Sequence, residues 1–282
     1  MSRLLASLDA PPSGRERAVW FDAGDYGRAK LLGGAAVPWG SPAELASFVA
    51  KLQGMFRSDA ILADGGAVFA QRAAGDARLR AAMAARARPG YPLRTLLADE
   101  QARAAAAEAV RALAATAGGV PLVLTVPAPG RWLGAAAEQA GADPGPLAAE
   151  RAETAAMYVA DMLRTFGALG VDGLLLDEGP AHGSGLVHPD AYRSVLNVAD
   201  HYGWPVLIRT DAAAAWPHGN IPGVTAWLGS AAADVLSGPW GVVASAGFWD
   251  GGKPDQDAEL VLAPVPAQAD PEAVMKRVRA LV

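Results

Sequence analysis

Carboxylates follow several short apolar runs of this 282-residue chain, and carboxyl groups are side chains that hold or transfer protons in active sites. In the run Gly173-Leu-Leu-Leu-Asp-Glu178, two acids follow three leucines, and Gly-Pro comes next. Asp22 and Asp64 end similar runs. Because adjacent strand residues point to opposite faces, one of Asp177 and Glu178 should face a ligand, and Glu178 is favoured. We therefore predict Asp22, Asp64 and Glu178 as catalytic residues.

Further polar and aromatic side chains stand at or just beyond the ends of the same runs. Arginine would hold an anionic group of a substrate, and tyrosine would donate a hydrogen bond to it. Any single carboxylate here would serve equally well as a helix cap or an ion-pair partner, so the prediction depends on their recurrence. The predicted substrate-binding residues are Asp25, Tyr26, Arg28, Arg131, Trp132, Asp177, His182, Arg209, Asp211 and Trp227.

The residue types that bind metals and cofactors give little signal. The chain has no cysteine, which excludes disulfides, thiolate zinc sites and iron–sulfur clusters. Its histidines show no metal-ligand spacing, and no nucleotide-binding glycine motif or GxSxG nucleophile motif occurs. A hard cation on the acid cluster is an alternative, but we predict a site without metal or cofactor.

The elements that would position these side chains are eight short runs rich in β-forming residues. The runs are nearly continuously apolar, which is typical of parallel strands buried on both faces. They span residues 18–22, 60–64, 121–125, 173–177, 205–209, 224–228, 241–245 and 258–263. Helical stretches are predicted near residues 42–55, 70–85, 93–117, 146–169 and 188–202, and a last helix follows Asp270-Pro-Glu.

This alternation predicts an α/β fold, a single-domain (β/α)8 TIM barrel over residues 1–282, with abbreviated C-terminal βα units. Residues 1–16 are expected to be a flexible or peripheral segment. A doubly wound sheet is the competing architecture because it shares the alternation. In a barrel the carboxyl ends of all strands meet at one mouth, which would bring the acids together.

Composition limits the partners. The chain is 52% hydrophobic and 19% charged, with a net charge of −5, which argues against nucleic acid and anionic membranes as partners. No signal peptide and no membrane span is predicted. We expect a cytoplasmic protein with a small-molecule substrate, and a homodimer as one candidate assembly.

Four segments, in order, resemble the uroporphyrinogen decarboxylase family. Arg17-Ala-Val-Trp-Phe-Asp-Ala-Gly-Asp-Tyr26 is similar to its first strand and loop, and Asp59-Ala-Ile-Leu-Ala-Asp64 to the strand with its catalytic aspartate. Val120-Pro-Leu-Val-Leu-Thr-Val-Pro-Ala-Pro129 and Gly170-Val-Asp-Gly-Leu-Leu-Leu-Asp-Glu178 resemble two later strands. The wider superfamily includes cobalamin-independent methionine synthase and corrinoid-dependent methyltransferases, all on a (β/α)8 barrel.

The resemblance implies a diverged lyase in which Asp64 stabilises an intermediate and Glu178 transfers a proton. Haem synthesis is not expected, because Asp25 stands where the family has a carboxylate-binding arginine, and acids repel a polycarboxylate substrate. Zinc-dependent methyl transfer is excluded by the absence of cysteine. The predicted activity is decarboxylase-type carbon–carbon lyase chemistry on a small organic substrate. The alternatives are a glycoside hydrolase-like carboxylate pair and a non-catalytic barrel that binds a ligand or a partner subunit.

Overall fold

The computed structural model describes residues 2–146, 148–179, 189–210, 221–229, 240–252 and 258–281. The described chain forms eight parallel strands in one sheet, in the order β1-β8-β7-β6-β5-β4-β3-β2. The predicted α/β barrel is therefore confirmed, as a nearly closed TIM barrel. Its strands are β1 (Ala18–Asp22), β2 (Ile61–Asp64), β3 (Leu122–Pro127), β4 (Gly173–Asp177), β5 (Val206–Thr210), β6 (Ala226–Gly229), β7 (Trp240–Val243) and β8 (Leu260–Pro264).

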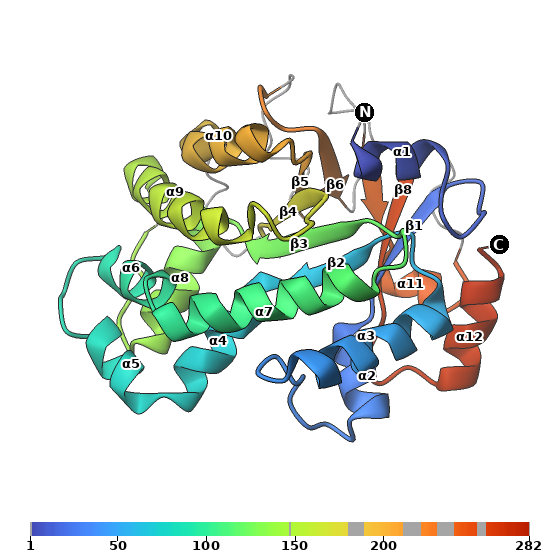
Figure 1. Cartoon of the computed structure of the whole chain (residues 1–282), viewed down its shortest axis with the longest axis horizontal. Coiled ribbons are helices and arrows are strands. Elements are labelled where there is room, and N and C mark those ends of the chain that lie inside the picture. Colours follow the sequence, from blue (N-terminus) through green and yellow to red (C-terminus); the bar gives the residue numbers. More distant parts are fainter. Residues whose placement is uncertain are drawn as a thin grey trace.

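Helices cover the outside of the sheet, with α7 running along β2 and β3 in Figure 1. None of the described helices is long and apolar enough to cross a membrane. The described helices are α1 (Arg3–Asp9), α2 (Gly24–Leu31), α3 (Pro42–Phe56), α4 (Gly65–Gly75), α5 (Ala77–Met83), α6 (Tyr91–Leu97), α7 (Glu100–Thr116), α8 (Pro129–Gln139), α9 (Ala149–Leu163), α10 (Arg193–Tyr202), α11 (Ala246–Trp249) and α12 (Pro271–Arg279), with 3-10 turns η1 (Arg164–Phe166) and η2 (Pro189–Tyr192).

Two of the predicted helices are each divided in the structure. Asp76 accepts hydrogen bonds from the N–H groups of Arg78 and Leu79 and so starts α5 after α4 has ended. Asp99 caps α7 in the same way through the N–H of Ala102. An aspartate at an N-cap stabilises a helix start, so these acids break the apparent continuity of the two helical patterns.

The interior of the barrel is filled by side chains that alternate along each strand. Trp20, Val123, Leu175 and Leu207 belong to one buried cluster inside the ring of strands, and their neighbours in sequence face the helices instead. Leu4 from α1 joins the same cluster and is 1% exposed. Helix α1 therefore closes the amino-terminal end of the barrel with an apolar side chain.

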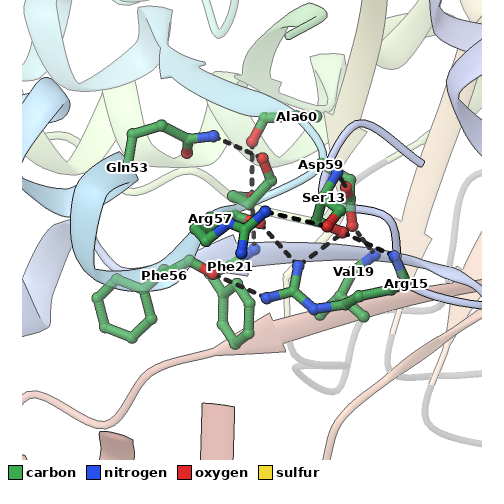
Figure 2. Close-up of polar contacts among 10 residues, drawn as sticks. Ser13, Arg15, Val19, Phe21, Gln53, Phe56, Arg57, Asp59 and Ala60 are labelled. Carbon is green, nitrogen blue, oxygen red and sulfur yellow. Dashed lines mark hydrogen bonds and ion pairs between the residues drawn. The ribbon is translucent and has the colours of Figure 1, made fainter. Parts of the chain in front are cut away.

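The two ends of the strand order, β1 and β2, are joined differently from the other neighbours. No β-ladder connects them within the described residues, and Figure 2 shows the contacts that take its place. The N–H of Asp59 donates to the carbonyl of Val19 at 2.9 Å, and the N–H of Val19 donates to the Asp59 carboxylate at 2.9 Å. The N–H of Phe21 donates to Ser58 Oγ, also at 2.9 Å. We call this junction the seam.

A buried arginine holds the seam together (Figure 2). The Arg15 guanidinium donates to the carbonyls of Phe56 and Arg57, at 3.0 and 2.7 Å. It also lies 3.3 Å from the carboxylate of Asp59, and the two side chains are 2% and 0% exposed. Because Asp59 accepts from the N–H of Ser13 as well, its buried charge is fully surrounded by donors.

Candidate active site

A layer of polar side chains lies directly above the apolar interior, at the carboxyl ends of the strands. Each member stands two residues after an inward-facing apolar residue, so strand alternation points it into the mouth. Register places Asp64 beside Thr125 and Asp177 beside Arg209. The members of this polar layer are Asp22, Asp64, Thr125, Asp177 and Arg209.

The polar layer borders a cavity of about 630 Å³. The cavity also reaches Arg131 and Trp132 at the start of α8, and Arg28 of α2. Trp39 also lines it. A cavity of this size accommodates an organic ligand together with some water.

Asp64 ends β2 and caps α4 at the same time. Its Oδ1 accepts a hydrogen bond from the N–H of Ala67 at 2.9 Å. Helix α4 begins at the next residue, Gly65, because Gly65 and Gly66 carry no side chain. A Cβ on Gly66 would lie 2.5 Å from Cδ of Pro127. These glycines let the helix start against β3, and this fixes the carboxylate at the rim of the cavity.

The acidity of Asp64 is shifted by its surroundings. The residue is exposed and lines the cavity. Burial raises the pKa of Asp64 from its ordinary value to about 6, against the hydrogen bond from Ala67 and with help from the negative charges of Asp22 and Asp177. The carboxyl group can therefore hold a proton at mildly acidic pH.

Arg209 lies between the other two acids of the polar layer. Its guanidinium is 3.8 Å from the carboxylate of Asp22 and 3.9 Å from that of Asp177. Burial raises the pKa of Asp22, and the positive charge of Arg209 opposes that shift. Asp177 also pairs with Arg131 and accepts the N–H of Gly179 at 2.9 Å. The mouth thus holds two arginines and three acids, and the negative charges of the acids repel one another.

Glu178 is placed differently from what we predicted. Asp177 shares the inward face with Leu175 and lines the cavity, whereas the next residue has the opposite parity. The Glu178 carboxylate instead accepts a hydrogen bond from the Tyr192 hydroxyl at 2.6 Å. Burial raises the pKa of Glu178 to about 7, although the Tyr192 hydrogen bond lowers it. The preference for Glu178 over Asp177 as the ligand-facing acid is corrected accordingly.

The remaining predicted residues divide between the mouth and the core. Asp25 and Arg28 line the cavity and lie 3.6 Å apart on exposed side chains. Tyr26 is fully buried against Phe56 of α3, behind the barrel wall, so the predicted hydrogen bond from its hydroxyl to a ligand is corrected. Trp227 packs in the core between the strands and the helices, because it alternates with inward-facing neighbours on β6. His182 and Asp211 lie outside the described residues.

Thr125 belongs to the polar layer and was not among the predicted site residues. Its Oγ1 is buried and has no hydrogen-bond partner among the described residues. The sequence signal was its place two residues after Val123 on β3, the same spacing that marks Asp177 after Leu175. Within the described part of the chain, no group of three or more acids and histidines is arranged to hold a metal ion.

The fold and the site together define an α/β barrel with an acidic, arginine-bearing cavity at the carboxyl ends of its strands. No family model matches the chain, and no curated protein does. Among solved structures it is similar to 2,3-dimethylmalate lyase, a PEP mutase/isocitrate lyase superfamily member. The identity is 13% and the TM-score 0.37, over 81% of this chain and 84% of that chain.

The expected membership of the uroporphyrinogen decarboxylase superfamily is therefore wrong. No family model and no curated protein supports it, and the similar solved structure is named as a member of a different superfamily. The four matching segments are apolar strands that end in an acid, a turn or a proline. Any parallel barrel with a polar mouth requires such segments, so they do not distinguish one barrel superfamily from another.

Proposed function

We propose that the protein is a lyase-type enzyme that removes a carboxylate, as carbon dioxide, from a small organic acid in the mouth of the barrel. Arg209 is the observation that carries this proposal. Its Nε is buried and has no hydrogen-bond partner among the described residues. The carboxylates of Asp22 and Asp177, at 3.8 and 3.9 Å, are too distant to accept a hydrogen bond from the guanidinium. A partly buried guanidinium with an unused Nε donor beside a cavity suits an anionic ligand.

Asp64 supplies the proton in the proposed reaction. Arg209 holds one carboxylate of the substrate while the carbon–carbon bond to a second carboxylate breaks. Carbon dioxide leaves, and the bonding electron pair stays on the substrate carbon. That carbon takes the proton of the neutral Asp64 carboxyl group, which water then reprotonates. The raised pKa of Asp64, about 6, keeps part of this carboxyl protonated near neutrality.

Two alternatives are weighed against this proposal. A glycoside hydrolase needs two carboxyl groups on either side of a bound sugar, whereas Asp22 and Asp177 are both in ion-pair distance of Arg209. A non-catalytic barrel would use the same arginine to bind an acid without turnover. Arg209 is compatible with both the lyase and the non-catalytic barrel. The experiment below distinguishes these two functions.

The test is a screen of small dicarboxylic acids for carbon dioxide release, with binding measured in parallel by calorimetry. Asn is as good a helix cap as Asp. Asp64→Asn therefore keeps the start of α4 and removes the carboxyl group that would donate the proton. We expect the kcat of this variant to fall by about 100-fold or more. Asp270→Asn is the matched control, because Asp270 caps α12 through the N–H of Ala273 and does not line the cavity.

Two results would contradict the proposal. Full turnover by Asp64→Asn would show that Asp64 only caps its helix. Binding of acids by the wild-type protein without any turnover would identify the barrel as a ligand-binding protein.

A further inference from the structure

The cavity extends well beyond the polar layer, and its second part has a different chemistry. It passes along the seam, where Phe21 of β1 and Ile61 of β2 border it. It then reaches α3, whose Phe48, Leu52 and Phe56 form its far wall. We call this part the apolar arm. The acids and Arg209 of the polar layer stand at the carboxyl ends of the strands, whereas aromatic and aliphatic side chains of α3 line the arm together with Gln53.

The seam explains why an arm can exist at this position. Between other neighbouring strands, ladder hydrogen bonds bring the backbones to about 4.8 Å and leave no passage. At the seam, the side chains of Ser58 and Asp59 accept the N–H groups of Phe21 and Val19 instead (Figure 2). Side chains thus take the place of a β-ladder between β1 and β2, and one cavity is lined both by the mouth and by α3.

We propose that the apolar arm binds the hydrocarbon chain of the substrate, whose carboxylate is held by Arg209. The substrate class is then an organic acid with an alkyl tail. This inference rests on the proposed function for the position of the carboxylate. The volume supports it, because 630 Å³ is far more than a short-chain acid fills. The arm also contributes apolar surface that gains from losing water to a hydrocarbon.

The test is a binding series of straight-chain monocarboxylates, from acetate to dodecanoate, measured by calorimetry on the full chain. Each methylene buried in the arm should tighten binding, by up to about fourfold per methylene. The increase should stop at the chain length that fills the arm. Affinity that does not change with chain length would overturn the inference. It would leave the proposed carboxylate site standing, provided that the short acids bind.

Two substitutions at one position locate the chain. Leu52 lines the arm and is half-buried, so Leu52→Trp fills space and Leu52→Ala opens it. We expect Leu52→Trp to remove the dependence on chain length while acetate and butanoate still bind as before. Leu52→Ala should keep that dependence. An unchanged series in a folded Leu52→Trp would overturn the placement in the arm.

A third variant separates failure of the arm from failure of the carboxylate site. Arg209→Gln should weaken binding of every acid by a similar factor of about 10 or more, because it removes the charged contact that all of them share. The dependence on chain length should remain. If Arg209→Gln binds all acids as well as the wild type does, the carboxylate site is wrong, and with it the proposed substrate class.

Discussion

Asp64 combines two tasks at the scale of a single residue. One oxygen accepts the Ala67 N–H and starts α4, while burial raises the pKa of the same carboxyl group to about 6. A capping hydrogen bond alone would lower the pKa of an aspartate. Desolvation by the walls of the mouth outweighs the cap, so the net shift of the Asp64 pKa is upward.

The shift has a consequence for stability. The folded-state pKa of Asp64, about 6, lies above the unfolded value, so the folded protein binds more protons between about pH 4 and pH 6. The contribution of Asp64 to the free energy of unfolding is therefore greatest below this range and is lost as the pH rises through about 6. We expect Asp64→Asn to flatten that part of the stability profile in urea titrations. A profile that is unchanged from the wild type would contradict the raised pKa.

Glu178 and Tyr192 give a second prediction at this scale. The 2.6 Å hydrogen bond from the tyrosine hydroxyl favours the ionised carboxylate and lowers a pKa that burial has raised to about 7. Tyr192→Phe should move the pKa of Glu178 further upward, as followed by NMR titration of the labelled side-chain carboxyl. Tyr158→Phe, on α9, is the control and should leave it in place. A pKa of Glu178 that does not rise in Tyr192→Phe would contradict the hydrogen bond.

At the scale of elements, the seam has one backbone hydrogen bond, from Asp59 to Val19, and buried side chains in place of a β-ladder. Asp59→Ala would leave the Arg15 guanidinium buried without its carboxylate and would remove the acceptor of the Val19 N–H. We expect a loss of about 3–5 kcal/mol in the free energy of unfolding, measured in urea. Ser58→Ala removes one acceptor, that of the Phe21 N–H, and should cost about 1–3 kcal/mol. The ranking of the two variants is the critical result, and a larger loss for Ser58→Ala would contradict the account of the seam.

Helix α1 is the other element with a measurable contribution. Leu4 is 1% exposed at the amino-terminal end of the barrel interior, where it contacts the start of β4. Leu4→Ala should cost about 2–5 kcal/mol, because it leaves a cavity among side chains that cannot collapse across a ring of strands. Leu8→Ala, on the same helix but only partly buried against the cluster, should cost less. Equal losses would show that α1 does not close the barrel through Leu4.

The elements were largely predictable from sequence, for a physical reason. Strands buried on both faces need continuous apolar residues, and each of the eight runs became a strand within about two residues of its predicted ends. The breaks at Asp76 and Asp99 were missed because an aspartate inside an apolar periodic pattern is equally compatible with an exposed helix position. The seam could not be predicted, because the sequence does not show which pair of neighbouring strands lacks a β-ladder.

The lining of the cavity was predictable only where strand alternation decides. Asp22, Asp64, Asp177 and Arg209 line it because of their positions at strand ends, and their roles stay predictions. Choosing between Asp177 and Glu178 required the inward face of β4, which Leu175 defines only in the folded barrel. The apolar arm was not foreseen, because Phe48 and Leu52 on α3 appear in the sequence as ordinary core residues of an amphipathic helix.

At the scale of the whole molecule, closure of the ring brings together side chains from strands far apart in sequence. Asp22 of β1 and Arg209 of β5 are 3.8 Å apart although 187 positions separate them in the numbering. The barrel therefore has an apolar interior and, at the carboxyl ends of its strands, a charged cavity. The charged mouth is the basis of the acid site that we propose, and the apolar arm is the basis of the proposed site for its chain.

The most direct test is a crystal structure of the protein with octanoate bound. The account predicts that the carboxylate lies within hydrogen-bond distance of Arg209, beside Asp64, and that the alkyl chain enters the seam toward Leu52. Octanoate bound on another surface, or bound in the mouth with its chain directed away from the seam and its carboxylate away from Arg209, would contradict it.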